Sequence, residues 1–342
     1  MQYPAPLKPG STIAITAFSS GVPQACHARL DIIISALKAL GFQVIQGECL
    51  RQDIQHVSAP KKERAEELMT FLCDDSIDAV IPPWGGEFAM ELLPLLDFDK
   101  LSSVSPKWVV GFSDVSTIMM ALTTRLGWGT AHAANLLQLH PNESEPLTAN
   151  LLGWLGLEPS QSFTQHSSAN FESMGESFAD NPHALLNCKI PTCWKILGED
   201  EQVTFSGRLI GGCFDTLTHI IGTEHFDLDR YAASVKEEGV ILYLENAEMS
   251  PTVLKRALLS LKFKGVFDVI NGLLIGRNAV MDNGGKAISG LDASIDVLTD
   301  VDIPIVYDVD IGHLPPNLTL VNGALANVTV KSGKGVVTQS LT

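Results

Sequence analysis

The feature that most constrains this chain is the regular alternation of short apolar strands and helical segments between Ser11 and Leu126. Runs rich in β-branched residues favour strands, whereas apolar residues spaced three or four apart favour helices. Repeated strand–helix units pair their strands in parallel, so the alternation predicts an α/β fold with a mostly parallel sheet. We expect strands at Ser11–Ala17, Phe42–Ile45, Ala79–Pro82 and Trp108–Gly111, and helices at Ala28–Leu40, 58–72 with Ser58 as N-cap, Glu87–Leu95 and Val115–Leu126.

A second alternation follows after Cys193, and the two are separated by a polar stretch over 141–187 that is rich in Ser, Asn, Gln and Pro. Such composition favours an irregular connection, and 342 residues suit two domains. We therefore predict an N-terminal domain at 1–150, a linker at 151–192 and a smaller C-terminal α/β domain at 193–342; an insertion within one domain is the alternative. The later strands are expected at Ser206–Ile210, Gly239–Leu244, Val269–Ile275 and Ile303–Val309. The later helices are expected after Gly211-Gly212 and at Pro251–Leu261 and Ser289–Leu298. We expect a β-hairpin at Leu318–Val337, with turns at Asn322-Gly323 and Ser332-Gly333.

Composition narrows the function. The formal net charge of −16 opposes binding to nucleic acid and to anionic membranes. No targeting segment is evident, and no apolar run approaches the roughly 20 residues of a membrane-spanning helix. The six cysteines are scattered without metal-ligand spacing, so we expect no metal and no cofactor. Free thiols are typical of a reducing cytosol, which predicts a cytoplasmic protein.

Ser113 is the first candidate for chemistry, because it follows the expected strand Trp108–Gly111 and precedes a helix. A serine on a sharp strand-to-helix turn can expose its hydroxyl close to the free N–H groups of the helix, which favour a developing oxyanion. The sequence Gly-Phe-Ser-Asp-Val departs from the usual G-x-S-x-G pattern. The alternative is that Ser113 only caps the helix.

Two further polar residues follow apolar strands, at the sheet edge where sites form in α/β proteins. Glu245 ends the run GVILYLE, and His313 follows IVYDVDIG. A histidine could take the Ser113 proton while the carboxylate orients the imidazole. Either residue could instead be a solvated strand end or loop residue, and His132 is the strongest competitor for the role of the base.

Three other positions are candidates for binding. Gly85-Gly86, next to Trp84, lets backbone N–H groups approach a ligand, although a plain tight turn is the alternative. Arg277 follows a strand and could grip a substrate carboxylate, or could form a structural ion pair. Trp84 or Trp194 could pack on an apolar part of a substrate, and Trp194 could equally belong to the core.

Six segments occur in the order WGGE, PKWVVGFSD, GRLIGGCFDTLTHIIGT, ILYLEN, LLIGR and DIGH. Taken together, they resemble the LD-carboxypeptidase family, serine peptidases that include the microcin C immunity peptidases. The resemblance implies a flavodoxin-like N-terminal domain, a triad of Ser113, His313 and Glu245, and an oxyanion hole made by the N–H groups of Gly86 and Asp114. It also implies a homodimer, no metal, and a small peptide or peptide-nucleotide substrate.

The departures from the family pattern bear on the substrate. This chain has Gly85-Gly86-Glu87-Phe88 in place of a Gly-Gly-Tyr-Gly-like turn, Cys213 in place of an Asn, and His132-Ala133-Ala134 in place of His-Gly-Pro. The stretch 92–97 is closer to the microcin-immunity branch. Three functions therefore remain in view. The first is cleavage of an L,D-peptide bond in murein peptides, and the second is hydrolysis of an aminoacyl-nucleotide antibiotic. The third belongs to another functional class: a ligand-binding protein without catalytic activity.

Overall fold

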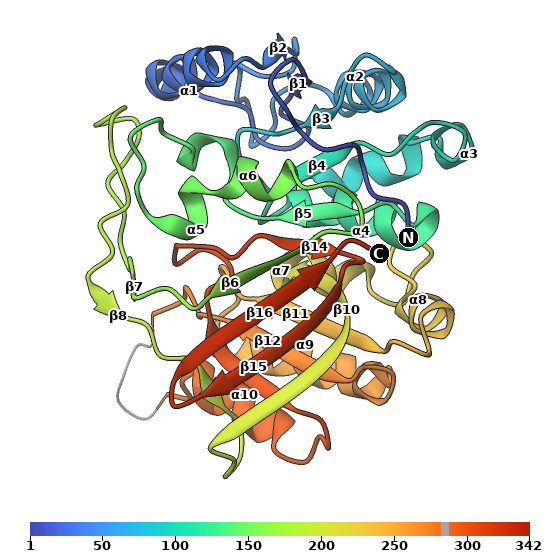
Figure 1. Ribbon diagram of the computed structural model, residues 1–342, viewed down its shortest axis with the longest axis vertical. Helices are drawn as coiled ribbons and strands as arrows, with labels where there is room; N and C mark the ends of the chain where they lie inside the picture. Colours follow the sequence, from blue (N-terminus) through green and yellow to red (C-terminus); the bar gives the residue numbers. More distant parts are fainter. Residues whose placement is uncertain (282–286) are drawn as a thin grey trace.

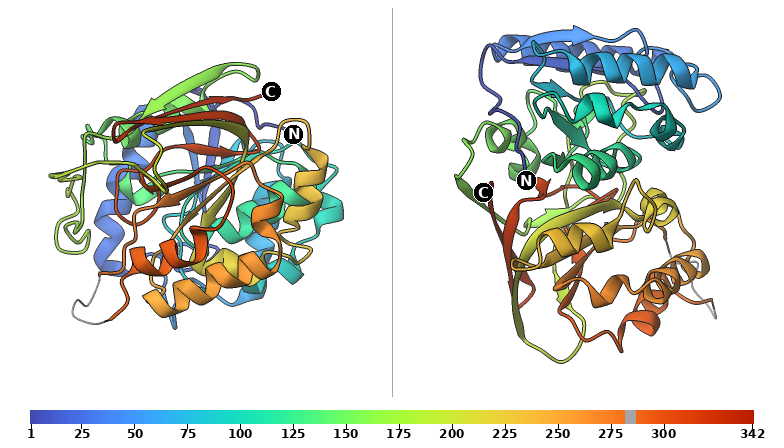
Figure 2. Two further views of the ribbon diagram at one scale, coloured as in Figure 1. Left: turned by 90° about the horizontal axis from the view of Figure 1, so that it is seen from below. Right: turned by 90° about the vertical axis from the view of Figure 1, so that its right-hand side faces the viewer.

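The computed structural model describes residues 1–281 and 287–342, and it has two lobes, each built around one sheet (Figures 1 and 2). The N-terminal lobe forms the upper half of Figure 1 and the C-terminal lobe the lower half. Both chain termini lie near the junction, where the Tyr3 hydroxyl donates to the Thr342 carbonyl oxygen over 3.3 Å. The two-domain α/β architecture predicted from the sequence is confirmed.

The N-terminal sheet has the strand order β14-β5-β4-β3-β1-β2. All neighbours are parallel except β14, which pairs antiparallel with β5. Without β14 the order is the flavodoxin-like 2-1-3-4-5, which confirms that expectation. The strands are β1 (Thr12–Ile15), β2 (Gln43–Gln46), β3 (Ala79–Val80), β4 (Trp108–Gly111), β5 (Thr130–His132) and β14 (Leu320–Asn322).

Helices of this lobe match the expected periodicity, with two local differences. The expected helix at Glu87–Leu95 is a 3₁₀ helix, η2 (Ala89–Leu95), which contains Pro94. Ser58 does not cap the next helix: the helix is preceded by Pro60, and the Ser58 hydroxyl donates to the Ala17 carbonyl oxygen. The helices are α1 (His27–Ala39), α2 (Lys61–Cys73), α3 (Phe98–Leu101) and α4 (Val115–Leu126), with the short η1 (Gln24–Cys26) and η3 (Leu136–Gln138).

The C-terminal sheet has the order β6-β16-β15-β10-β11-β12-β13-β9. Its centre, β10 to β13, is parallel, and antiparallel strands flank it on both sides. The strands are β6 (Ser162–His166), β9 (Lys195–Ile196), β10 (Gln202–Cys213), β11 (Val240–Glu245), β12 (Gly272–Gly276), β13 (Ile305–Val309), β15 (Leu325–Lys331) and β16 (Lys334–Ser340). The helices are α7 (Phe214–Ile220), α8 (Leu228–Ser234), α9 (Pro251–Phe263) and α10 (Gly290–Leu298), with η4 (Val266–Asp268).

Two segments differ from the predicted organisation. The polar stretch 141–187 and the linker predicted at 151–192 are not irregular throughout. This region contains α5 (Pro146–Ala149), α6 (Leu151–Leu155) and the small β7–β8 pair (Asn170–Phe171 and Ile190–Pro191). It also contains β6, which joins the C-terminal sheet by pairing with β16. Asn322-Gly323 is not a hairpin turn, because β14 belongs to the N-terminal sheet and β15 to the C-terminal sheet. The turn at Ser332-Gly333 does join a hairpin, β15–β16.

The two lobes share one of the hydrophobic cores. Side chains of α4, such as Ile118, belong to the same buried cluster as Phe214 of α7 and Leu242 of β11. Polar contacts cross the same junction: the Ser116 hydroxyl accepts from the Cys213 backbone N–H over 3.0 Å. The C-terminal ends of β4, β11 and β13 are thereby brought to one region between the lobes.

Candidate active site

Ser113 occupies the turn that joins β4 to α4, and its backbone φ is +65°. A positive φ is costly for a residue with a β-carbon and is concentrated at functional sites. Gly111, with φ of +147°, precedes the turn, and a β-carbon there would lie 2.7 Å from the Asn135 amide oxygen. The local sequence therefore holds the serine side chain at the end of the strand in a strained conformation.

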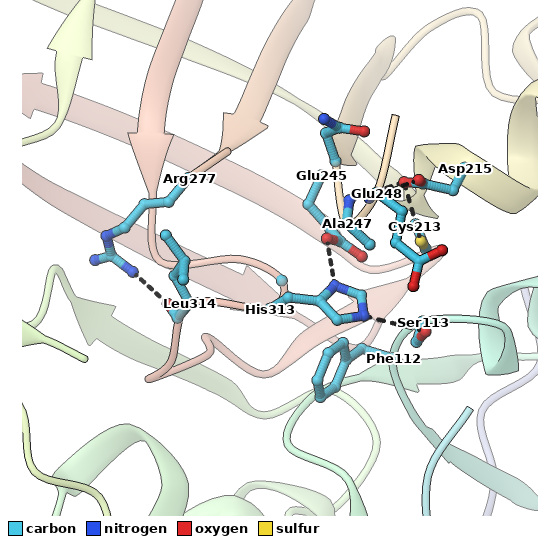
Figure 3. A network of polar contacts seen from close by, with 12 residues as sticks. Phe112, Ser113, Cys213, Asp215, Glu245, Ala247, Glu248, Arg277, His313 and Leu314 are labelled. Atoms are coloured by element: carbon cyan, nitrogen blue, oxygen red, sulfur yellow. Dashed lines mark hydrogen bonds and ion pairs between the residues drawn. The ribbon is translucent and has the colours of Figure 1, made fainter. Parts of the chain in front are cut away.

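Ser113, His313 and Glu245 form one chain of hydrogen bonds (Figure 3). The distance from His313 Nε2 to Ser113 Oγ is 3.2 Å, and the distance from His313 Nδ1 to Glu245 Oε2 is 2.9 Å. The serine comes from the N-terminal lobe, whereas the other two residues follow or end β13 and β11 of the C-terminal lobe. The Phe112 ring packs edge-on against the imidazole at 4.9 Å between centroids.

Two glycines allow the carboxylate to approach the loop that carries His313. A β-carbon at Gly312, where φ is +103°, would lie 2.4 Å from Glu245 Oε2. One at Gly276 would lie 2.3 Å from the Ile311 carbonyl oxygen and 2.8 Å from the Glu245 β-carbon. The Glu245 side chain is fully buried, while that of His313 is 29% exposed. The imidazole is therefore accessible to a bound molecule, whereas the carboxylate behind it is not.

The electrostatics of the pair favour a charged imidazolium–carboxylate state. Burial alone would raise the pKa of Glu245, but the charge and hydrogen bond of His313 outweigh it and hold this pKa below its usual value. Burial likewise opposes the protonation of His313, yet Glu245, with smaller contributions from Asp215 and Glu248, raises its pKa above the usual 6.5. An imidazole poised in this way can accept a proton from a neighbouring hydroxyl.

The Gly85-Gly86 turn packs directly against Ser113. A β-carbon at Gly85 would lie 2.7 Å from the Asp114 nitrogen and 2.9 Å from Ser113 Oγ, so only glycine fits there. Within the described residues, the backbone N–H groups of Gly86 and Asp114 have no protein acceptor. Asp114 follows the serine in the chain and Gly86 follows the glycine that packs against it, and each has a backbone donor available.

The Asp114 carboxylate fixes this turn rather than facing a ligand. It is buried, and it accepts from the Ser19 hydroxyl over 2.6 Å and from the Ala89 N–H over 2.7 Å. Its second oxygen accepts from the Thr117 hydroxyl over 2.9 Å. The segment that carries Gly86 is therefore tied to the residue next to the serine.

Sequence reasoning missed Asp215, which organises the loop after Glu245. Its carboxylate accepts from the backbone N–H groups of Ala247, Glu248 and Met249 over 2.8 to 3.0 Å (Figure 3). The loop places the exposed Glu248 carboxylate on the Ser113 side of His313. The sequence does show this aspartate near the start of the helix predicted after Gly211-Gly212, where it is the second residue of α7. Nothing near it in the sequence, however, identifies the loop that its carboxylate binds.

Arg277 forms a structural ion pair, which was the alternative to its predicted role as a substrate ligand. Its guanidinium is buried, pairs with the Asp310 carboxylate and donates to the Thr192 hydroxyl and to the Leu314 carbonyl oxygen. These partners stabilise the segment beside His313 and leave the guanidinium little capacity to grip a substrate. The role of a substrate-carboxylate ligand is therefore not supported for this arginine.

Trp84, Trp194 and His132 form no hydrogen bond with Ser113, His313 or Glu245 in the described part of the chain. The half-buried Trp84 donates from its indole nitrogen to the Ser20 carbonyl oxygen over 3.1 Å. Trp194 is buried and donates to Asp310 over 2.8 Å, so it belongs to the core. His132 is buried against Tyr243, contacts neither Ser113 nor a carboxylate through a hydrogen bond, and has its pKa lowered to about 4 by burial.

The described residues, 1–281 and 287–342, contain no group of three or more His, Cys, Asp or Glu side chains that could hold a metal ion. They also contain no helix that is both long and apolar enough to cross a membrane.

Comparison with known proteins identifies the family to which both lobes belong. Family models described as the LD-carboxypeptidase N-terminal domain and the LD-carboxypeptidase C-terminal domain match residues 13–133 and 206–328. The microcin C7 self-immunity protein MccF of Escherichia coli is 26% identical, over 92% of this chain and 90% of its own. A Bacillus subtilis protein whose name describes a murein peptide carboxypeptidase is 24% identical, over 98% and 93%.

Solved structures show the same fold over the full length. The structure of MccF in complex with glutamyl sulfamoyl guanosine superposes with a TM-score of 0.82 at 23% identity and covers 98% of both chains. The family models lie on the two lobes that supply the serine and the histidine–glutamate pair. The chain belongs to the LD-carboxypeptidase family of carboxypeptidase-like hydrolases.

Proposed function

We propose that this protein is a serine carboxypeptidase that cleaves an amide bond of a small peptide through Ser113, His313 and Glu245. The observation that carries the proposal is the unbroken chain of contacts from the serine hydroxyl through the imidazole to the buried carboxylate. The strained backbone of Ser113 and the two N–H groups beside it support the same reading.

The mechanism follows from these contacts. Ser113 Oγ attacks the carbonyl carbon while His313 Nε2 takes its proton, and Glu245 stabilises the imidazolium. The N–H groups of Gly86 and Asp114 donate to the tetrahedral oxyanion. His313 then gives the proton to the leaving amine, and water hydrolyses the acyl-enzyme by the same steps in reverse order.

The decisive test is Ser113→Ala with a fluorophosphonate probe. If the three residues act as a unit, kcat should fall by about 10⁶, and labelling of the protein should disappear. Wild-type protein should be labelled at Ser113. Full turnover by the Ser113→Ala protein would show that Ser113 is not the nucleophile, whereas no labelling of the wild type would favour the non-catalytic ligand-binding alternative.

For the substrate we propose an L,D-peptide bond of a murein peptide. The family assignment and the relative named for murein peptides support this choice. Hydrolysis of an aminoacyl-nucleotide antibiotic is the second candidate, favoured by the match to MccF over nearly the whole chain and by the departures at Cys213 and Glu87. Offering both substrates to the purified protein and comparing kcat/KM separates the two.

We also propose a homodimer that acts in the cytoplasm. All six cysteines are free, which fits a reducing compartment. The dimer rests on the family resemblance, and light scattering of the purified protein tests it: a monomer at micromolar concentration would contradict it.

A further inference from the structure

A cavity of about 240 Å³ opens beside His313, between the lobe junction and the segment 172–186. His313 and Pro315 line one end, and Arg29, Gln138 and Leu186 are among the residues that line the rest. In the proposed mechanism His313 gives its proton to the leaving amine. A cavity that begins at His313 is therefore placed to receive the leaving group, which in a carboxypeptidase is an amino acid with a free carboxylate.

Arg29 is held rigidly at this cavity. The residue is only 1% exposed, and its guanidinium donates from Nε to the Leu137 carbonyl oxygen over 2.8 Å and from Nη1 to the carbonyl oxygens of Pro182 and Ala184 over 3.1 and 2.8 Å. The guanidinium carbon also lies 4.3 Å from the centre of the Phe178 ring. A buried cation with such fixed neighbours is preorganised, so it can bind a ligand with little loss of side-chain entropy.

One nitrogen of this guanidinium, Nη2, has no protein acceptor among the described residues. Nη2 is not completely buried, so a ligand atom can reach it. Burial lowers the pKa of Arg29 to about 10, which leaves it charged at neutral pH. A charged, nearly enclosed donor without a protein acceptor is the group expected to bind an anion.

Three carboxylates also line the cavity, and each already accepts a hydrogen bond from the protein. Glu143 accepts from the backbone N–H groups of Ser144, Glu145 and Leu186 over 2.9 Å each. Glu172 accepts from the Asn187 N–H over 3.1 Å, and Glu176 from the Asn181 side chain over 2.9 Å. Arg29 is the sole arginine or lysine in the described lining of the cavity.

We propose that Arg29 binds the free carboxylate of the departing amino acid and so makes the enzyme select for the C-terminal residue of its substrate. The inference rests on the proposed function and replaces Arg277 in this role. It assigns the cavity beside His313 to the leaving group and names the substrate class as peptides with a free C-terminal carboxylate, not C-terminally blocked ones.

The test compares two substrates: an L,D-tetrapeptide ending in D-alanine, and the same peptide with a C-terminal amide. Wild-type protein should prefer the acid, and Arg29→Gln should lose about 10- to 100-fold in kcat/KM on the acid with little change on the amide. Arg29→Lys should keep part of the preference. Arg125→Gln is the matched control, because Arg125 stacks on Phe98, 3.8 Å from the ring centre, and is not part of this cavity.

The outcomes separate the inference from the proposed function. Arg29 also ties down the segment at 182–184, and loosening that segment would slow both substrates alike, so an equal loss on acid and amide overturns the inference. If the wild type hydrolyses neither peptide, the proposed substrate fails, and the binding of D-alanine and of D-alaninamide, followed by NMR titration, decides the inference. Selective binding of the acid that is lost in Arg29→Gln supports it, and equal binding of the two compounds overturns it.

Discussion

At the scale of single residues, the pair His313–Glu245 links the chemistry to pH. Protonation of His313 is favoured in the folded protein, so its contribution to stability is present below the usual histidine pKa and is lost as pH rises through the raised value. For Glu245 the sign is opposite: its contribution is present above the usual glutamate pKa and is lost as pH falls through the lowered value. In the proposed mechanism His313 acts as a neutral base, so the acid limb of kcat/KM should lie above 6.5.

Replacing Glu245 by Gln should move that limb. The amide removes the charge that raises the His313 pKa, so the limb shifts to lower pH, and kcat falls by about 10⁴ because the imidazole loses its preferred tautomer. The measurement is a pH profile of kcat/KM. Glu248→Gln is the control: this exposed carboxylate contributes least, so the limb should shift slightly and kcat should hold. Equal profiles for wild type and Glu245→Gln would exclude the pairing as the cause.

The Gly85 position tests how tightly the turn fits the nucleophile. Gly85→Ala would place a β-carbon 2.7 Å from both Ser113 Cβ and the Asp114 nitrogen, so the oxyanion donors must shift. We expect kcat to fall by about 10²-fold or more, as when one oxyanion donor is lost. Gly153→Ala is the matched control, since nothing lies within 4 Å of its β-carbon position in α6. It should keep full activity; a Gly85→Ala enzyme that does so too would show that the turn tolerates a side chain.

At the scale of elements, local signals were enough wherever an element's partners are close in sequence. The expected β4 and α4 agree with the structure at both ends, which placed Ser113 on its turn. Ser58 was wrong as a cap because a tertiary contact with Ala17 takes its hydroxyl. The pairing of β6 with β16 and of β14 with β5 joins segments more than 150 residues apart, and no local pattern encodes such partners.

The candidate site follows the same rule. Ser113, Glu245 and His313 could be predicted from the sequence because each ends or follows an apolar strand, and parallel strands bring their ends to one edge of the sheet. Arg277 follows a strand in the same way, but its chemistry depends on Asp310, 33 residues further along. Arg29 lies inside α1 and carries no strand-end signal, so only the folded cavity identifies it.

The Asp310 pair should be structural and should act on the loop that carries His313. Asp310→Ala would leave Arg277 charged and buried without its partner, which typically costs about 3–5 kcal/mol. The free energy of unfolding, measured by urea titration, should fall by about this amount. Asp296→Ala, which removes an exposed pair with Lys255, should cost about 0–1 kcal/mol. If the two variants lost similar amounts of unfolding free energy, the buried Asp310–Arg277 pair would not stabilise the fold more than an exposed pair does.

At the scale of the whole molecule, the candidate active site requires both lobes in one fixed arrangement. The proposed nucleophile, Ser113, belongs to one lobe, and His313 and Glu245 belong to the other, so a small rotation between the lobes would break the contact between His313 and Ser113. The structure opposes such a rotation with the shared core around α4 and α7 and with the strand β14, which the C-terminal half of the chain contributes to the N-terminal sheet. Catalytic geometry and interlobe packing therefore depend on the same contacts.

This coupling predicts that the protein unfolds in one cooperative transition. Asn322 is the sharpest place to test it: its side chain accepts from the buried Tyr243 hydroxyl over 2.7 Å and donates to Thr130 over 3.0 Å, which links β11 to β5. Asn322→Ala leaves the Tyr243 hydroxyl and the Gly211 N–H without their acceptor, at a cost of about 1–3 kcal/mol each. Calorimetry should show a single transition at a lower temperature, with activity lost over the same range. Two separate transitions in the wild type would mean that the lobes are stable independently and that their packing does not hold the triad together.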